Sequence, residues 1–440
     1  MSPQANWCRC TSCHAGYGWK DKHFDFSSSE RIDCLVCHDT TGEYRKFPTA
    51  CGNPVMTEKK FGKQIFPAVD LRKVALKVGK TSRITCGSCH FYGGGGDGVK
   101  HGDLDSSLCK AAKALDVHMD IKGLNYSCTT CHVTKSHKIS GRYYSRPAPG
   151  KRQLALPADD GERLACESCH GRNPHKKNEK LNHHTDKVAC QSCHIPRYAR
   201  GGIFTKMEWD WSTAGKLTEN GEAIVKKDKS GNLIYHSKKG DMGWAKDVVP
   251  EYFWYNGSMS YVEAGAKISA ADEALELNSL KGSYPDAQAR IFPFKVMRGK
   301  QPFDPVTRML VVPHLFGKKG SGAYWGEYNW ENAAAVGMRE AGLPFSGKVD
   351  FIETSMYWPI THMVAPKEVS LSCEECHRRG TGRLENLKSF YLPGRDYWQI
   401  LDSLGWGAVG LTGLVLLLHA GLRFIGSSRR EDGDSQGGES

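Results

Sequence analysis

The stretch Cys86-Gly-Ser-Cys-His90 shows the pattern that decides how this chain folds. The same pattern, Cys-x-x-Cys-His, occurs seven times in 440 residues and takes up fourteen of the seventeen cysteines. Only 18 residues of the chain are histidine, so chance does not explain why one follows every Cys-x-x-Cys. The seven copies are Cys10, Cys13 and His14; Cys34, Cys37 and His38; Cys86, Cys89 and His90; Cys128, Cys131 and His132; Cys166, Cys169 and His170; Cys190, Cys193 and His194; and Cys373, Cys376 and His377.

This pattern is the attachment signature of c-type haem. Two cysteines three positions apart reach the two vinyl groups of one porphyrin, and the adjacent histidine lies under the iron as its proximal ligand. Zinc ribbons do not need the histidine, thioredoxin-like motifs occur singly, and disulfide scaffolds are short chains. The sequence therefore predicts seven haem c groups, one at each motif.

The charge of the chain supports this prediction once the cofactors are counted. A formal net charge of +12 would by itself favour nucleic acid or an anionic surface as the partner. Seven haems bring up to fourteen propionate charges, which lowers the net charge to about −2 and removes the argument for nucleic acid. The haems also supply apolar surface for the interior, which suits a chain with only 39% apolar residues.

The spacing of the motifs predicts the fold class and the domains. Dense motifs leave room for short helices and loops, so we expect a mainly α fold with extensive coil, built around closely packed haems, and one C-terminal transmembrane helix. The predicted parts are a haem-dense region with six motifs (1–200), a haem-free wrapping region that carries distal ligands (201–372), the seventh haem and a linker (373–403), the transmembrane helix (404–426) and a disordered cytoplasmic tail (427–440).

Local patterns predict a few elements. Short helices are expected over 108–117, from the Ser269–Asp272 start through Leu280, and over 331–341. The alternation over 222–236, around Lys229-Ser-Gly-Asn232, predicts a β-hairpin.

The segment 404–425 is apolar and long enough to span a membrane. Arg423, Arg429 and Arg430 follow or end it, so the positive-inside rule places the C-terminus in the cytoplasm and the haems on the periplasmic side of the bacterial inner membrane. His419 lies inside the segment, where an ionisable residue is a functional candidate. It either packs between helices or ligates a b-type haem with a partner subunit.

The remaining histidines are candidate distal ligands. A low-spin electron-transfer haem takes a second axial ligand, whereas an open or weakly held position permits substrate to bind. Six histidines near motifs or on polar loops are expected to be distal ligands, which leaves one haem without one: His101, His118, His137, His175, His184 and His362.

Several longer stretches resemble the octahaem tetrathionate reductase family of c-type cytochromes. They are Cys10-Thr-Ser-Cys-His-Ala-Gly-Tyr-Gly-Trp19, Asp33-Cys-Leu-Val-Cys-His-Asp-Thr-Thr-Gly42, Cys86-Gly-Ser-Cys-His-Phe-Tyr-Gly-Gly-Gly-Gly-Asp-Gly-Val-Lys-His-Gly-Asp-Leu-Asp105, Ala189-Cys-Gln-Ser-Cys-His-Ile-Pro196 and Glu353-Thr-Ser-Met-Tyr-Trp-Pro-Ile-Thr-His362. The resemblance covers most of residues 7–380.

The resemblance implies a periplasmic reductase of tetrathionate, nitrite or hydroxylamine, in which one haem is the active site and the others carry electrons. The His14 haem, attached at Cys10 and Cys13, matches the active-site haem. A lysine amine is expected as its axial ligand, and Lys100 is the choice, with Lys80 as the alternative.

The family has eight haems and also a cysteine ahead of the active-site motif, where this chain has Cys8. An eighth haem motif and a signal peptide are therefore expected upstream of Cys10. Cys51 and Cys109 have no assigned role, and a disulfide between them is one option.

Three functions stay open on the sequence alone. The first is a membrane-anchored reductase that takes electrons from a redox partner, such as a cytochrome b-type quinol-oxidising subunit, and passes them to a small inorganic substrate. The second is a non-catalytic electron conduit between such a partner and a terminal acceptor. The third is an oxidase of hydroxylamine or sulfur compounds.

Overall fold

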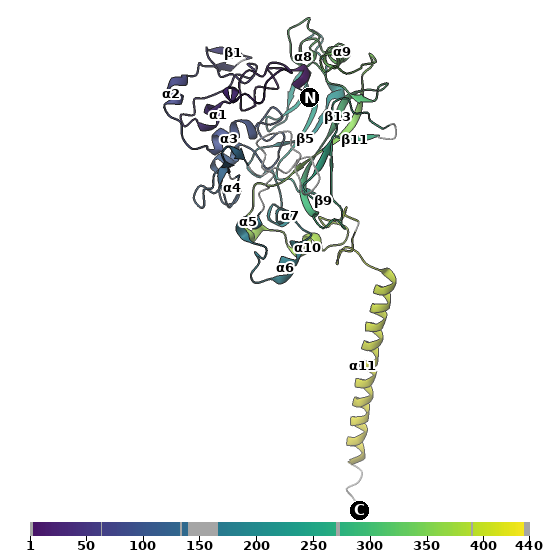
Figure 1. The fold of residues 1–440 in the computed structure, drawn as a ribbon. Helices are drawn as coiled ribbons and strands as arrows, with labels where there is room; N and C mark the ends of the chain where they lie inside the picture. Colours follow the sequence, from purple (N-terminus) through teal and green to yellow (C-terminus); the bar gives the residue numbers. More distant parts are fainter. Residues whose placement is uncertain are drawn as a thin grey trace, which may run out of the picture. The chain divides into compact units, whose positions relative to one another are not determined.

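A computed structural model describes residues 3–62, 64–132, 134–139, 166–269, 273–388 and 390–434 (Figure 1). The chain divides into two compact units, Met1–Leu371 and Ser372–Ser440. Each unit is described by itself.

Five of the six haem motifs of the first unit lie on or at the ends of very short helices joined by loops, and the motif of Cys10, Cys13 and His14 lies in turns. The helices have four to eight residues, well below the length at which an isolated helix is stable in water. They therefore depend on what they pack against. They are α1 (Cys34–His38), α2 (Leu71–Ala75), α3 (Arg83–His90), α4 (Cys128–Cys131), α5 (Glu167–His170), α6 (Glu179–His184) and α7 (Cys190–His194).

Short 3₁₀ turns and two small antiparallel ribbons complete this part of the unit. The 3₁₀ helices are η1 (Pro3–Ala5), η2 (Ser29–Arg31) and η3 (Ser106–Lys110), and the ribbons pair β1 (Lys59–Phe61) with β2 (Gln64–Phe66) and β3 (Thr134–Lys135) with β4 (Lys138–Ile139). The helix expected over 108–117 is wrong, because only η3 forms there.

A nine-stranded mixed sheet dominates the rest of the first unit. The order along its main path is β11-β15-β13-β5-β8-β7-β6, and β9 and β14 pair with β13. The strands are β5 (Thr205–Asp210), β6 (Val225–Lys227), β7 (Leu233–His236), β8 (Gly240–Ala245), β9 (Glu251–Tyr255), β11 (Ala274–Glu276), β13 (Arg290–Asp304), β14 (Met309–Leu310) and β15 (Asp350–Pro359).

The long strand β13 organises this sheet, and Figure 1 shows it between β5 and β11. It pairs antiparallel with β15, with Phe294 opposite Pro359 and Phe303 opposite Asp350. It pairs parallel with β5, with Arg298 opposite Glu208. Strand β13 therefore pairs with both β15 and β5 near its middle, and it connects the strands on its two sides.

Further elements cover or flank the sheet. They are η4 (Trp211–Thr213), the small ribbon of β10 (Met259–Tyr261) and β12 (Asn278–Leu280), α8 (Tyr324–Glu327), α9 (Trp330–Glu340) and η5 (Lys367–Val369). Helix α9 is capped by Asn329, whose side chain accepts a hydrogen bond from the backbone of Asn332.

Ordinary side chains form the core of the sheet. One cluster joins Trp209 and Trp211 to Leu315 and Tyr324, and another joins Phe292 and Phe294 to Tyr255 and Met259. The stacked rings of Tyr324 and Trp330 are 3.9 Å apart. This part of the chain therefore builds its core from aromatic and aliphatic side chains.

The fold class predicted from the sequence is therefore wrong in one respect. The chain is 26% helix and 21% strand, not mainly helical. The hairpin over 222–236 is confirmed as β6 and β7, and the helix over 331–341 as α9. The helix expected from Ser269 to Leu280 is wrong in its described part, which forms β11 and β12, while residues 270–272 lie outside the described residues. Pairing with β15 overrode the helical pattern there.

The second unit contains the seventh motif and one long helix. Helix α10 (Cys373–Cys376) carries the cysteines, and α11 runs from Gln399 to Asp434, beyond the predicted end at 426. Gln399–Gly426 is long and apolar enough to cross a membrane. Thr412 donates its hydroxyl to the Ala408 carbonyl, as is usual for a polar side chain in an apolar helix.

Candidate haem sites

Six of the seven motifs lie on short helical turns, and the motif of Cys10 lies in irregular turns. In α1, α3 and α7 the two cysteines and the histidine lie within the helix, and in α5 the first cysteine, Cys166, is the N-cap, which places both thiols on the same side. Asp33 caps α1 by accepting a hydrogen bond from the Val36 backbone at 3.2 Å, and Ser82 forms a capping box on α3. All fourteen motif cysteines carry free thiols, so each is available for a thioether bond.

Four of the predicted distal histidines lie opposite a proximal histidine. The ring centroids are 6.3 Å apart for His38 and His137, 6.1 Å for His170 and His118, 6.2 Å for His132 and His362, and 6.2 Å for His194 and His175. These four separations agree within 0.2 Å although the ring planes meet at angles from 8° to 77°. The four pairs therefore share one separation between ring centroids but no common angle between the ring planes.

That separation fits one metal ion between two imidazoles. Metal–imidazole bonds of about 2 Å put two ligand nitrogens roughly 4 Å apart and the ring centres about 6 Å apart. Direct ring stacking would favour a shorter distance, and unrelated histidines would not repeat one value. The residues at these four sites therefore fit bis-histidine haem.

Hydrogen bonds select which ring nitrogen faces the cofactor. The Nδ1 atoms of His14, His38 and His377 lie 2.5, 2.8 and 2.7 Å from the carbonyl oxygens of Thr11, Gly79 and Pro393. An Nδ1–H that donates to a carbonyl leaves Nε2 unprotonated for the iron. The backbone therefore sets these proximal rings in the ligating tautomer.

The assignments of His101 and His184 as distal ligands stay predictions. His101 lies 5.1 Å from Trp358 between ring centroids, and burial lowers its pKa to about 3, so its imidazole is neutral as a ligand must be. His184 lies in α6, with Nδ1 2.7 Å from the Lys180 carbonyl. His23 and His183 are exposed, and His314 lies with its Nδ1 2.7 Å from the Ala5 carbonyl.

The surroundings of His14 differ from those of the four pairs. In the described part of the chain its ring contacts are with Trp19 at 5.2 Å and Phe24 at 5.4 Å, and both are edge-on. Its Nε2 atom is buried and has no hydrogen-bond partner among the described residues. A buried nitrogen without a partner is costly unless another group uses it. This observation fits a haem iron held by His14.

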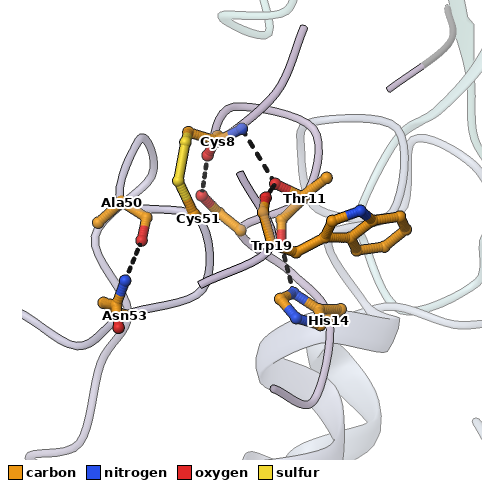
Figure 2. Close-up of a disulfide and its surroundings, with 8 residues drawn as sticks. Cys8, Thr11, His14, Trp19, Ala50, Cys51 and Asn53 are labelled. Carbon is orange, nitrogen blue, oxygen red and sulfur yellow. Dashed lines mark hydrogen bonds between the residues drawn. A yellow bond between two sulfur atoms is a disulfide. The ribbon is translucent and has the colours of Figure 1, made fainter. Parts of the chain in front are cut away.

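A disulfide holds the loop around His14. Figure 2 shows Cys8 bonded to Cys51, next to Thr11, Trp19 and His14. The Cys8 amide donates to Thr11 Oγ1 at 3.0 Å, and that hydroxyl donates to the Trp19 carbonyl at 2.6 Å. The option of a disulfide between Cys51 and Cys109 is therefore wrong, and Cys109 is a free thiol.

Gly52 follows the disulfide and packs directly on the His14 ring. A Cβ atom at this position would lie 2.7 Å from His14 Cε1 and 2.3 Å from the Gly16 carbonyl, and φ is +91°. Only glycine fits such a position. The disulfide and Gly52 together restrict the His14 ring to one orientation.

Asp33 ties the first two motifs together. Its buried carboxylate accepts hydrogen bonds from the hydroxyls of Tyr17 and Tyr44 at 2.8 and 2.5 Å, and it pairs with Lys46 at 3.0 Å. Lys46 in turn donates to the carbonyl oxygens of His14 and Gly16 at 2.8 Å each. One charge network therefore links the α1 cap to the backbone of the His14 motif.

Lys100 is half-buried and Lys80 is exposed, which favours Lys100 as the ligating amine. The Lys100 amine lies 4.4 Å from the Trp358 ring centroid, and burial lowers its pKa. A lowered pKa favours the neutral amine that a metal needs. The Lys100 charge also lowers the pKa of His90, after burial and the charges of His132 and His362. Lys100 thus lies in the neighbourhood of His90.

The partner of the Lys100 amine stays a prediction. The charges that act on His14 are those of Lys46 and Asp33, secondary to burial, which lowers the His14 pKa. The assignment of Lys100 to the His14 haem is therefore open to a direct test, with the His90 haem as the alternative.

Asp103 orients His362, one of the predicted distal ligands. It is 1% exposed, and its Oδ2 atom accepts hydrogen bonds from the backbones of Thr361 and His362 at 2.7 and 2.9 Å and lies 3.2 Å from His362 Nδ1. Burial alone would raise the Asp103 pKa, but these bonds lower it to about 2. A carboxylate on Nδ1 makes the other ring nitrogen a stronger ligand.

Thiols of neighbouring motifs touch each other. A hydrogen bond with Cys128 raises the pKa of Cys86 and lowers that of Cys128 to about 7. The pair of Cys166 and Cys190 behaves in the same way. Because a motif cysteine would attach to the edge of a porphyrin, contact between the thiols of two motifs would bring the edges of their haems close together. Such an arrangement suits electron transfer along the chain.

Sequence reasoning missed three functional features of this unit. They are the Cys8–Cys51 disulfide, the carboxylate of Asp103 and the buried cation of Lys295. In the sequence Asp103 and Lys295 looked like ordinary polar residues, and only the apolar run Ile291–Val296 that Lys295 interrupts was a usable signal.

Comparisons with known proteins agree with the haem sites. The family described as bacterial cytochrome c matches residues 206–380, which include most of the sheet and the seventh motif. The crystal structure of the octaheme cytochrome c from Shewanella oneidensis is similar with a TM-score of 0.74 and 44% sequence identity over 87% of this chain and 80% of that chain. No curated protein matches the sequence. At this identity and coverage the family is established: the chain belongs to the multihaem c-type cytochromes and binds haem c.

Proposed function

We propose that the chain is a membrane-anchored periplasmic reductase that passes electrons along its haems to an active-site haem held by His14, with Lys100 as the distal ligand. Tetrathionate, nitrite and hydroxylamine are the candidate substrates. Bound haem supplies reversible one-electron chemistry at iron. The residues of the chain decide which haem is accessible to a substrate.

The observation that carries the proposal is the contrast between His14 and the four paired histidines. His38, His132, His170 and His194 each have a histidine at the one-metal distance. His14 has Trp19 and Phe24 beside its ring and a buried Nε2 without a hydrogen bond in the described residues. An axial position without histidine permits exchange with a substrate.

Cations near His14 favour an anionic substrate. Arg31 lies 5.5 Å from the centroid of the Phe24 ring, which itself contacts His14, and Arg9 lies 5.2 Å from that of Phe61. Positive charge at the mouth of a site raises the local concentration of an anion and its rate of association. Tetrathionate and nitrite have this charge.

Electrons are expected to enter from the membrane. The apolar helix Gln399–Gly426 would anchor the haems next to a quinol-oxidising partner, such as a cytochrome b-type subunit. The short distance between motif thiols supports fast transfer within the first unit.

The deciding experiment compares Lys100→Met with Lys80→Met in the haem-loaded protein. Reduction of tetrathionate, nitrite and hydroxylamine is followed with a reduced dye, and the ferric haems are examined by electron paramagnetic resonance. We expect Lys100→Met to change one haem signal and to lower turnover of one substrate by about tenfold or more. An unchanged Lys100→Met protein would exclude this lysine as the ligand, and loss of activity in Lys80→Met would transfer the role.

The identity of the ligated haem is tested separately. His14→Gly and His90→Gly each remove one proximal ligand, and the variant that loses the lysine-type signal identifies the haem. A protein in which every haem is bis-histidine and no substrate is reduced would instead be an electron conduit. Oxidation of hydroxylamine or thiosulfate, measured with an oxidised dye, tests the opposite direction.

A further inference from the structure

Lys295 is a fully buried lysine in the middle of the sheet. It is 0% exposed and lies in β13 between Phe294 and Val296, which are also buried. Successive residues of a strand face opposite sides, so Lys295 faces away from the aromatic cluster that contains Phe294. A buried charge is expensive, and an apolar residue of similar size would usually stabilise such a position. Its presence therefore needs a reason.

The Lys295 amine has as many hydrogen-bond acceptors around it as an ammonium group has donors. Its Nζ atom donates to the carbonyl oxygen of Val99 at 2.8 Å, to that of Lys100 at 3.1 Å and to Thr205 Oγ1 at 2.6 Å. An ammonium group has three N–H donors, and three acceptors are present. The charged group is therefore fully satisfied inside the protein.

Thr205 forms a hydrogen bond with the carbonyl of one further residue, Gly98. Its hydroxyl donates to the Gly98 carbonyl at 2.7 Å while accepting from Lys295. Three consecutive carbonyls, those of Gly98, Val99 and Lys100, are thus held from strands β5 and β13. The sheet fixes the backbone of the loop that presents Lys100.

The glycine run before Lys100 needs such support. Gly94, Gly95 and Gly98 have φ of +79°, +90° and +64°, and Gly93 leaves room for the Lys100 side chain, whose Cδ would be 3.2 Å from a Cβ placed there. Glycines allow this path but do not enforce it, because they lose more conformational entropy on folding than other residues. A loop of this kind holds an amine in place only if something else fixes its backbone.

We propose that Lys295, with Thr205, is a positioning residue that holds the Lys100 backbone so that the Lys100 amine stays on its iron. The proposal rests on the proposed function, because it takes Lys100 as a haem ligand. Lys295 touches no haem atom in this role and acts through the carbonyls of Val99 and Lys100. Removing these hydrogen bonds should make the Lys100 backbone more mobile without affecting the bis-histidine haems.

The chain offers a matched control in Lys206. This lysine is also buried, at 3% exposure, and lies in the neighbouring strand β5. Burial lowers the pKa of both lysines to about 7. The Lys206 amine, however, lies 3.6 Å from the Trp209 ring centroid and 5.2 Å from that of Trp244, away from the glycine run.

The test compares Lys295→Met, Thr205→Val and Lys206→Met in the full-length, haem-loaded protein. Three quantities are measured: the lysine-type signal in electron paramagnetic resonance, the rate at which cyanide binds the ferric protein, and hydrogen exchange of the amides over 93–103. We expect Lys295→Met to alter the signal, to speed cyanide binding by about tenfold or more and to raise amide exchange, because charge-assisted hydrogen bonds are lost. Thr205→Val should change the same three quantities less, and Lys206→Met should match the wild type.

The outcomes separate the two proposals. A wild-type signal and cyanide rate in Lys295→Met would overturn the positioning role while leaving the proposed function intact. If Lys295→Met fails to assemble its haems, Thr205→Val decides, since it keeps shape and removes one donor. Equal effects in Lys206→Met would also overturn the role, because they would reflect general destabilisation. An unchanged signal in Lys100→Met would overturn both proposals.

Discussion

The haem-rich region (residues 10–194) and the sheet region (residues 205–359) of the first unit are stabilised in different ways. The haem-rich region has six motifs, helices of four to eight residues and small apolar clusters such as Phe47, Val55, Val69 and Val74. The sheet region has a strand of 15 residues and several clusters built on tryptophan, tyrosine and phenylalanine. The first region has only small side-chain clusters around its motifs, and the second builds larger clusters from its own side chains.

The difference explains where each kind of functional residue lies. Six of the seven proximal histidines and five of the six predicted distal ones belong to the haem-rich region, where attachment through the motif cysteines would fix the proximal rings. His362, which follows β15, and Lys295, in β13, lie on or directly after the sheet, which places them against the haem-rich region with little freedom. The sheet is a rigid scaffold, so it fixes the orientation of His362 and Lys295 more firmly than the loops of the haem-rich region would.

The largest expected effect comes from preventing haem attachment. Without haem, residues 10–132 and 166–194 lose their core, and their short helices do not form by themselves. The sheet region should keep its strands. Hydrogen exchange of the haem-free chain should show fast exchange in the first region and protected amides in β13 and β15. Equal protection in both regions would contradict the comparison.

The next effect tests the core of the sheet region. Leu315 is 1% exposed in the cluster with Trp209 and Tyr324, so Leu315→Ala should lower the free energy of unfolding by about 2–5 kcal/mol. Leu217 is 40% exposed and provides the same substitution as a control, with an expected change of less than about 0.5 kcal/mol. Urea unfolding followed by circular dichroism measures both. Similar losses for the two variants would mean that the cluster is not the core.

The third effect tests how the sheet region tunes a haem. Asp103→Asn removes the anionic acceptor next to His362 Nδ1, so the histidine becomes a weaker donor to iron and the reduction potential of the His132 haem should rise. The predicted His194 haem, whose facing histidine His175 lies elsewhere, is the internal control. Potentiometric titration followed by electron paramagnetic resonance assigns the change. A uniform shift of all potentials would point to altered folding instead.

The smallest effect concerns acid stability of the sheet region. Burial would raise the pKa of Asp304, but bonds from the Ser346, Thr307 and Val306 amides lower it to about 2. Because the folded pKa is below the unfolded value of about 3.9, this group stabilises the fold above pH 4 and the contribution is lost as the pH falls from about 4 to 2. It is worth up to about 2 kcal/mol.

Asp304→Asn should remove that part of the pH dependence. The variant should unfold more easily at neutral pH and lose less of its remaining stability between pH 4 and 2. Thermal unfolding at several pH values measures both slopes. Parallel slopes for wild type and Asp304→Asn would show that other carboxylates dominate acid unfolding. Glu219, which is exposed, serves as the control for a carboxylate removed without such bonds.

Several features of this protein followed from the sequence alone. The seven Cys-x-x-Cys-His motifs are local patterns, because the two cysteines and the histidine of each lie within five consecutive residues. Turn residues and periodicity were also sufficient for the hairpin of β6 and β7 and for helix α9. These features depend on residues that are neighbours in the chain, so their pattern is visible in the sequence.

The tertiary structure decided the rest, because it joins residues far apart in the chain. The sheet brings β5, β13 and β15 together and turned an expected helix into β11 and β12. The tertiary structure also places His362 opposite His132, brings Cys8 and Cys51 together in a disulfide, and places the Lys295 amine next to the carbonyl of Lys100. Each of these contacts gains its free energy only when distant segments pack, and no local pattern records it.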